Sequence, residues 1–309
     1  MRKTSFMTWL ARCTLVLLTA VAAGCATQPA PTAAVPDTTF GVLVMAHGGS
    51  KQWNDTVLAA VEPLRERYKL DVAFGMAVAA SLQTSVSKLE TQGVRRIAVV
   101  RLFVSGESWY ERTQQILGIA PGAPARPPAA ANAHAGHEGN PHAGHSMEFW
   151  RIDTQSTFVM SKEGLADAEE MDAILAERVR RLSRDPKSED VLLLAHGPGE
   201  DAENVRWIEK ITARTAALRA AQPFRRVEVH TLREDWPEKR QAAEQGVREF
   251  VRRATSDNGR AIVIPFRVEG FGPYAKVLSD LEYASDGVGL LPHPNVTKWI
   301  ERQIATLQP

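Results

Sequence analysis

The feature that most constrains the fold is a short string that occurs twice in the chain. Residues 41–49 read GVLVMAHGG and residues 190–197 read DVLLLAHG, so that in each copy an apolar run ends in His-Gly. A short apolar run bounded by glycine is typical of a strand buried on both faces, as in a parallel sheet. Two such matches in a chain of 309 residues indicate an internal duplication.

Helices and strands follow each copy in the same order. In the first half the periodicity predicts helices over 53–68, 82–92 and 166–182, a further segment over 108–117, and strands at 71–76, 96–104 and 156–160. In the second half it predicts helices over 202–221, 238–254 and 295–307, a further segment over 274–283, and strands at 226–231, 261–268 and 288–291. Each half is therefore expected to contain four β-α units.

This alternation defines the expected fold class and the division into domains. Strands that alternate with helices of about ten or more residues predict an α/β protein with parallel sheets covered on both faces, here arranged as a tandem duplication. We expect the first domain over residues 40–186 and the second over 187–309. The main difference between them is an insertion in the first domain, at about residues 120–147.

Composition excludes several classes of protein. Hydrophobic residues make up 44% of the chain and charged residues 24%, as in ordinary globular domains. The 37 Lys and Arg residues nearly balance the 36 Asp and Glu residues, so no basic field predicts a nucleic-acid partner. The only cysteines, Cys13 and Cys25, lie near the N-terminus, which excludes a disulfide-stapled fold and a cysteine metal site in the folded body. The sequence does not indicate an oligomeric state.

The first 25 residues predict export. The chain begins with the basic segment MRK, continues with a largely apolar run over 13–23, and reaches Cys25 through small residues. This run is shorter than the about 20 apolar residues that span a bilayer. The pattern resembles a bacterial lipoprotein signal, which predicts a signal peptide over 1–24, lipidation of Cys25 and a periplasmic, membrane-anchored protein. A plain secretory signal is the alternative. Residues 25–39, rich in Pro, Ala and Thr, are expected to form a tether.

Half of the eight histidines lie in the insertion of the first domain. Residues 131–147 read ANAHAGHEGNPHAGHSM, in which the unit HAGH occurs twice. Such a tract cannot pack a core, and we expect it to be disordered without metal. Because imidazole suits Co, Ni, Cu and Zn ions, we expect the tract to capture a metal ion, with low-complexity drift as the alternative. The candidate ligands are His134, His137, His142 and His145.

Taken together, these motifs resemble the class II chelatases, the sirohydrochlorin cobaltochelatase and ferrochelatase group that inserts a divalent metal into a tetrapyrrole. The residues that carry the resemblance are the strand-His-Gly openings at 43–49 and 192–197, AASL at 79–82, GVRRIAVVRLFV at 93–104 and GLLPHP at 289–294. The resemblance covers residues 40–118 and 155–307.

The resemblance implies two flavodoxin-like domains with the tetrapyrrole bound in the cleft between them. His47 and His196 each follow a strand, and open α/β sheets bind ligands at the carboxyl ends of their strands. A neutral imidazole can bind a metal and accept a pyrrole proton near pH 7. Both histidines are therefore candidate metal ligands, and His47 is the candidate catalytic base. A capping or packing histidine is the alternative in each case.

The family's second histidine, a few residues beyond the third strand, has no counterpart in this chain. Its position aligns with Trp109, and residues 269–273 of the second half also lack histidine. Two acids lie nearby and can complete a His/Glu pair, a legitimate site for a first-row metal ion. Glu107 is the candidate co-ligand or proton acceptor, with a solvated loop acid as the alternative, and Glu269 is a candidate metal ligand.

The sequence supports two functions. The first is an exported lyase-class chelatase that inserts Co2+, Ni2+ or Fe2+ into a tetrapyrrole such as sirohydrochlorin. The second is a catalytically degenerate, exported protein that binds tetrapyrrole or a metal ion, Zn2+ included. The paired His-Gly openings favour the enzyme, whereas export and Trp109 favour the binding protein.

Overall fold

The computed structural model describes residues 39–128 and 148–308, which belong to one compact unit, Asp37–Pro309. Several predictions lie outside the described residues: the signal peptide, lipidation of Cys25, nearly all of the tether, and the four histidines of the insertion. No described helix is both long and apolar enough to cross a membrane.

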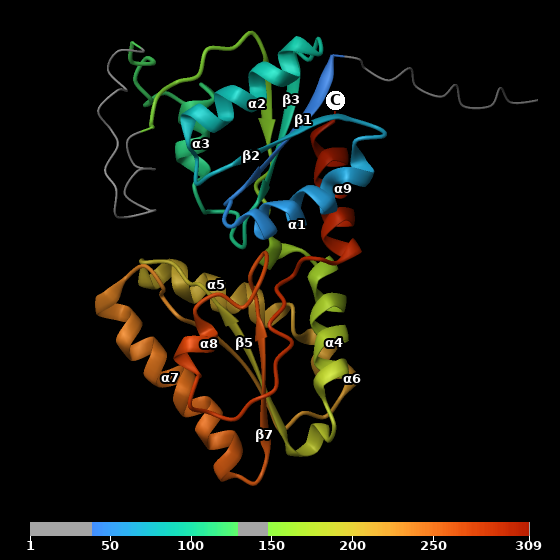
Figure 1. The fold of residues 1–309 in the computed structure, drawn as a ribbon, viewed down its shortest axis with the longest axis vertical. Coiled ribbons are helices and arrows are strands. Elements are labelled where there is room, and N and C mark those ends of the chain that lie inside the picture. Colours follow the sequence, from blue (N-terminus) through green and yellow to red (C-terminus); the bar gives the residue numbers. More distant parts are fainter. Residues whose placement is uncertain (1–38, 129–147, 309) are drawn as a thin grey trace, which may run out of the picture. The chain divides into compact units, whose positions relative to one another are not determined.

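The first half of the chain forms a parallel sheet with the strand order β2-β1-β3-β4 (Figure 1). Its strands are β1 (Phe40–Ala46), β2 (Lys69–Phe74), β3 (Arg96–Leu102) and β4 (Thr157–Met160). Along β1, Val42 and Val44 point to one face and Leu43 and Met45 to the other, and all four are buried. The sheet is therefore covered on both faces, as the apolar run predicts.

The helices of the first half begin and end where local chemistry dictates. The first three are α1 (Lys51–Val61), α2 (Ala79–Thr91) and α3 (Tyr110–Ile116). The side chain of Ser50 caps α1 by accepting a hydrogen bond from the amide of Trp53. The helix predicted over 53–68 ends at Val61, because Pro63 has no amide hydrogen and starts a separate 3-10 turn, Glu62–Leu64.

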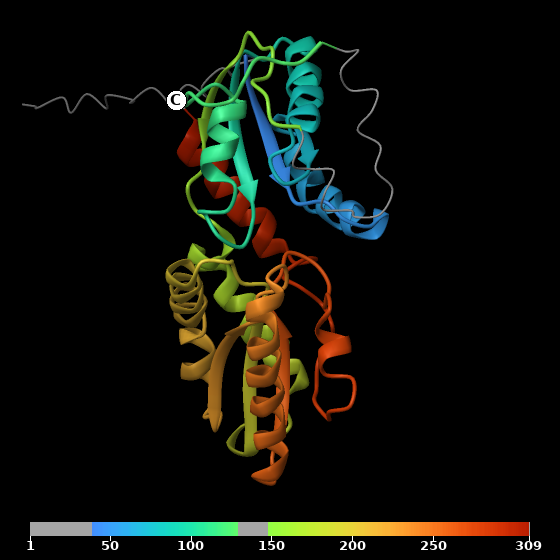
Figure 2. The same ribbon diagram turned by 90° about the vertical axis from the view of Figure 1, so that its left-hand side faces the viewer.

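Within the described residues, the second half forms a parallel sheet of three strands in the order β6-β5-β7. Its strands are β5 (Glu189–Ala195), β6 (Arg226–Thr231) and β7 (Arg260–Pro265). Its helices are α5 (Asp201–Ala213), α6 (Ala216–Ala221), α7 (Pro237–Ser256) and α8 (Tyr274–Val277). The helix predicted over 202–221 is thus two helices, and the segment predicted over 274–283 is helical for one turn only. Figure 2 shows the long helix α7 along one face of this sheet.

The prediction of a fourth strand in the second half, over residues 288–291, is wrong. Leu290 and Leu291 are buried, as the apolar run indicates, but their amides donate to the carbonyls of Arg267 and Val268 in the loop after β7. This segment passes beyond the end of the sheet on its way to the last helix. Among the described residues, an isolated bridge between Ile262 and Ala284 extends the sheet on that side.

The last helix of each half packs against the sheet of the other half. Helix α4 (Glu170–Leu182) contacts β7 and α6, whereas α9 (Pro294–Leu307) contacts β3 and α1 (Figures 1 and 2). The sequence does not predict this exchange, because both helices carry an ordinary apolar stripe. The boundary predicted between residues 186 and 187 therefore divides the sequence into two halves, but each half contributes its last helix to the packing of the other.

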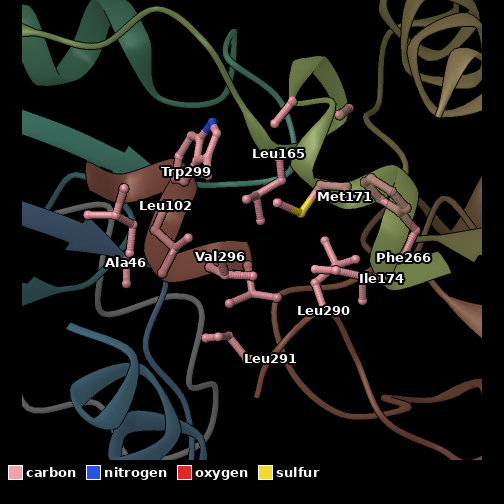
Figure 3. Close-up of a cluster of buried hydrophobic side chains, with 14 of the residues drawn as sticks. Ala46, Leu102, Leu165, Met171, Ile174, Phe266, Leu290, Leu291, Val296 and Trp299 are labelled. Carbon is pink, nitrogen blue, oxygen red and sulfur yellow. The ribbon is translucent and has the colours of Figure 1, made fainter. Parts of the chain in front are cut away.

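The exchange produces one continuous hydrophobic core between the sheets. Figure 3 shows Leu102 beside α9 residues Val296 and Trp299, and Phe266 of the second half near Ile174 of α4. All of these side chains belong to a single cluster of buried residues. The outer faces of the two sheets have separate clusters. The fold class is confirmed as α/β with parallel sheets, and the two halves share the core that joins them.

Candidate functional site

A pocket of about 470 Å³ lies at the carboxyl ends of the strands and is lined by both halves of the chain. This volume falls within the range of small-molecule sites, about 300–1,000 Å³. The pocket brings together all four site residues predicted within the described body: His47, Glu107, His196 and Glu269. The four side chains lie near the carboxyl ends of strands, where open α/β sheets bind their ligands.

The two His-Gly loops have the same local geometry. In each ring Nδ1 lies 2.7 Å from the carbonyl oxygen of the next residue, Gly48 for His47 and Gly197 for His196. The two glycines have φ values of 80° and 77°, in the left-handed region that favours glycine. Because a carbonyl only accepts, Nδ1 carries the hydrogen, and the lone pair of the neutral ring is on Nε2. The two copies therefore match in ring geometry as well as in sequence, and in each neutral ring Nε2 is the nitrogen that could bind a metal ion.

His196 makes a second contact, to a carboxylate. Its Nε2 lies 3.0 Å from Oδ2 of Asp235, which can only accept, so both ring nitrogens carry a hydrogen in this arrangement. Burial lowers the pKa of His196, but the hydrogen bond to Asp235 and the charges of Glu234 and Asp235 outweigh it, and the pKa is raised overall. His196 must lose this proton before it can bind a metal.

This ion pair predicts a pH dependence of stability. A histidine whose folded pKa is raised stabilises the protein fully below the unfolded pKa of about 6.5, and the contribution is lost as pH rises through the folded value. Asp235→Asn should lower the pKa of His196 and flatten this fall in the free energy of unfolding. Asp55→Asn, which removes a carboxylate paired with Lys51, should leave the fall unchanged. An NMR titration that finds His196 at or below the ordinary histidine value would contradict the ion pair.

Glu107 reaches the pocket but is held by cations of the second half. Nε and Nη2 of Arg206 donate to its two carboxylate oxygens, at 3.0 and 2.6 Å, and Nζ of Lys210 lies 3.9 Å away. The hydrogen bonds from Arg206, against a smaller opposing effect of burial, keep the pKa of Glu107 below its usual value. A carboxylate in this state is a weak proton acceptor, and it links the loop after β3 to α5.

Glu269 lines the same pocket and is half-buried. Within the described ranges, its side chain has no hydrogen bond or ion pair, so its oxygens are available to a proton or a cation. No group of three or more His, Cys, Asp or Glu side chains among the described residues is arranged to hold a metal ion.

The pocket has an aromatic lining that sequence reasoning missed. Four of the seven tryptophans of the chain line it: Trp53, Trp109, Trp207 and Trp236. Two of them pack on the glycines of the His-Gly loops, because a Cβ on Gly49 would lie 3.1 Å from Trp53 and one on Gly199 2.3 Å from Trp236. The signal available in the sequence was that Trp53, Trp109 and Trp236 each follow a predicted strand at short range, whereas Trp207 lies within a predicted helix.

A buried arginine holds the loop that carries Glu107. Arg101 is 1% exposed, and its guanidinium donates to the carbonyls of Ser108 and Ser161, at 2.7 and 3.1 Å, and to that of Gly106. Burial lowers the pKa of Arg101 to about 10, so it still carries a charge at neutral pH. Its planar fork bonds three carbonyls at once, which fixes the backbone at the rim of the pocket.

Arg101→Met should lower the free energy of unfolding by about 1–3 kcal/mol, because it leaves buried carbonyls without donors. Arg101→Lys should recover only part of this loss, since one ammonium cannot reproduce the fork. Chemical denaturation measures both effects. Arg180→Met, on the exposed side of α4, is the control and should change stability by no more than about 0.5 kcal/mol. Equal effects of Arg101→Met and Arg180→Met would show that the loop does not depend on Arg101.

The two remaining histidines of the described body serve the fold. Nδ1 of His293 accepts a hydrogen bond from the amide of Asn295 and caps α9. The ring of His230 packs edge-to-face on Phe250, with centroids 5.8 Å apart. Neither residue lines the pocket.

Two parallel sheets that share exchanged helices, with paired His-Gly loops at one pocket, define a chelatase-like fold. Residues 41–182 match the model of the CbiX family. The chelatase resemblance of the sequence is therefore confirmed, and the match covers the first half of the chain. No curated protein matches this sequence.

Solved structures show the same fold. SirB from Bacillus subtilis with Fe3+ is 13% identical, with a TM-score of 0.56, and the match covers 87% of this chain and 95% of that one. The sirohydrochlorin chelatase SirB from B. subtilis subspecies spizizenii, in complex with cobalt, is 12% identical, with a TM-score of 0.53 and the same coverage. A multi-domain protein of Deinococcus radiodurans with structural similarity to chelatases is 17% identical, with a TM-score of 0.51. That match covers 87% of this chain, which spans 55% of that protein.

Proposed function

We propose that this protein inserts a divalent metal ion, Co2+, Ni2+ or Fe2+, into a tetrapyrrole such as sirohydrochlorin. The observation that carries the proposal is His47, which lies at the end of β1 in a pocket with an aromatic lining. The CbiX match and the fold of SirB support the same class of reaction. Aromatic side chains suit a flat conjugated macrocycle, and His47 supplies a metal-binding nitrogen beside it.

The chemistry requires the macrocycle to lose two N–H protons as it gains the metal ion. In the neutral ring of His47, Nε2 has the lone pair, so it can bind the incoming ion or accept one proton. Glu269 is the best candidate for the second proton acceptor. Its carboxylate lines the same pocket and has no partner among the described side chains. The ion leaves with the product, so the protein needs only a transient hold on it.

The other two predicted residues take different roles in this proposal. His196 becomes a metal ligand only after it loses a proton and leaves Asp235. Glu107 acts chiefly by holding the rim of the pocket to Arg206, and it serves as a co-ligand only when that pair opens. We further propose that the histidine tract delivers the ion and that a lipid at Cys25 anchors the protein to a membrane on its periplasmic side.

Anaerobic metal insertion tests the proposal. Metal-free sirohydrochlorin is incubated with the full chain and Co2+, Ni2+ or Fe2+ in turn, and the absorbance change is compared with a protein-free control. The proposal predicts a faster change with at least one ion. A folded protein that accelerates none of the three reactions would contradict it.

A binding protein is the second candidate, and Trp109 at the place of a family histidine favours it. Calorimetric titration with Co2+, Ni2+ and Zn2+ distinguishes the two, using the full chain and a variant that lacks residues 131–147. Tight binding that disappears with this segment, in a protein without insertion activity, would indicate a metal-binding protein. Insertion activity that persists in the shortened variant would indicate an enzyme whose histidine tract is an accessory.

A further inference from the structure

Trp109 has two properties that rarely occur together. Its φ of 57° is in the left-handed region, where a bulky side chain is strained, and its side chain is 41% exposed. It is the only tryptophan among the exposed large hydrophobic side chains of the described residues, and it lines the pocket. Because much of the Trp109 indole is exposed, its packing does little to offset the free-energy cost of the strained backbone.

The surrounding structure holds this conformation from both sides. The carbonyl of Ser108, just before Trp109, accepts from Arg101, and the carbonyl of Trp109 accepts from the amide and the hydroxyl of buried Thr113, at 2.9 and 2.6 Å. Gly106 packs so closely on Lys162 that a Cβ there would lie 2.0 Å from its carbonyl oxygen. Strain that is enforced so thoroughly is typical of a functional position.

The other pocket tryptophans are engaged by the protein itself. Trp53 and Trp236 pack on their loop glycines, and Trp207 is buried, with its Nε1 donating to Glu203. Trp109 therefore presents the indole surface that a ligand can cover most fully. Conjugated rings stack favourably on indole without needing a hydrogen bond.

We propose that Trp109 is a substrate-positioning residue that stacks on the face of the tetrapyrrole. This inference rests on the proposed function, and it assigns a role to the position where the resemblance places a histidine. Metal handling is then left to His47, while Trp109 orients the macrocycle toward it. The ligand class is a flat, conjugated tetrapyrrole, and the interaction does not involve the metal.

Binding of metal-free sirohydrochlorin, measured by absorbance and by quenching of tryptophan fluorescence, tests the inference without any turnover. Trp109→Ala should weaken the affinity about five- to twentyfold, and Trp109→Phe should weaken it less, because a smaller ring still stacks. Ile119→Ala is the matched control, since Ile119 has the same exposed fraction of 41% and does not line the pocket. In insertion assays the loss in Trp109→Ala should appear in KM more than in kcat.

A stability measurement separates positioning from a structural role. Trp109→Gly relieves the left-handed strain, so the melting temperature should stay at or above the wild-type value while the affinity falls as in Trp109→Ala. Wild-type affinity in Trp109→Ala, or a melting temperature that falls in Trp109→Gly in step with the affinity, would overturn the inference. If the wild type itself does not bind the macrocycle, the proposed function fails as well, and this outcome is distinct from binding that ignores Trp109.

Discussion

Replacing His47 by alanine is expected to lower the rate of metal insertion by a factor of about 10²–10⁴, the usual contribution of a positioned proton acceptor. The affinity for the metal-free tetrapyrrole should stay close to the wild-type value, because the aromatic lining is retained. The side chain of His47 is exposed, so the free energy of unfolding should change little. Initial rates under anaerobic conditions, together with a binding titration, measure both quantities.

The duplication supplies a matched control in the twin histidine. His196 has the same contact to the following carbonyl, and its ring must lose a proton and leave Asp235 before it can bind a metal ion. His196→Ala should therefore reduce the rate much less than His47→Ala does. Equal losses in the two variants would show that the halves act equivalently, and a larger loss in His196→Ala would reverse the assignment of the metal-binding ring.

Trp299→Ala should lower the free energy of unfolding by about 3–5 kcal/mol. The indole is fully buried in the core that joins the two sheets, and its Nε1 donates to Glu163. Because this core includes both sheets, both halves should unfold in a single transition that shifts as a whole. Chemical denaturation followed by far-UV and near-UV circular dichroism measures the shift.

The same helix provides the control for this prediction. Lys298 precedes Trp299 and is exposed, so Lys298→Ala should change stability by no more than about 0.5 kcal/mol. A variant Trp299→Ala in which only part of the circular dichroism signal moves would indicate that the halves unfold separately. That result would contradict a shared core.

The sequence predicts the sheets well, for a physical reason. A strand buried on both faces is largely apolar, and residues 41–46 before His47 and 191–195 before His196 have this pattern without any tertiary information. The two histidines could be predicted for the same reason, because the carboxyl end of such a strand is the place where ligands bind. The duplicated strand-His-Gly string therefore indicates both the fold class and one wall of the pocket.

The local sequence of a helix or strand does not indicate which other element it packs against. An amphipathic helix shows which face is apolar but not which sheet covers it, and so the exchange of α4 and α9 could not be predicted. The buried pair Leu290 and Leu291 indicated a strand for a related reason. Burial was correct, but it comes from a crossing segment that lies between the sheets.

The candidate site divides in the same way. The presence of Glu107 and Glu269 in the pocket could be predicted from their place after a strand, whereas the pairing of Glu107 with Arg206 depends on how the two halves meet. The pairing of His196 with Asp235 comes from the loop after β6, which the strand-His-Gly string does not specify.

Catalysis of metal insertion in this pocket requires many turnovers per protein, so the number of turnovers separates an enzyme from a binding protein. The full chain is mixed anaerobically with a large excess of metal-free sirohydrochlorin and with Co2+, Ni2+ or Fe2+ in turn. The metallated product formed per protein is measured by absorbance, with His47→Ala alongside. Catalysis at His47 predicts many products per wild-type protein with at least one ion, and a rate in His47→Ala that is lower by a factor of about 10²–10⁴. At most one product per wild-type protein with each of the three ions, or equal rates in the two proteins, would contradict catalysis at this site.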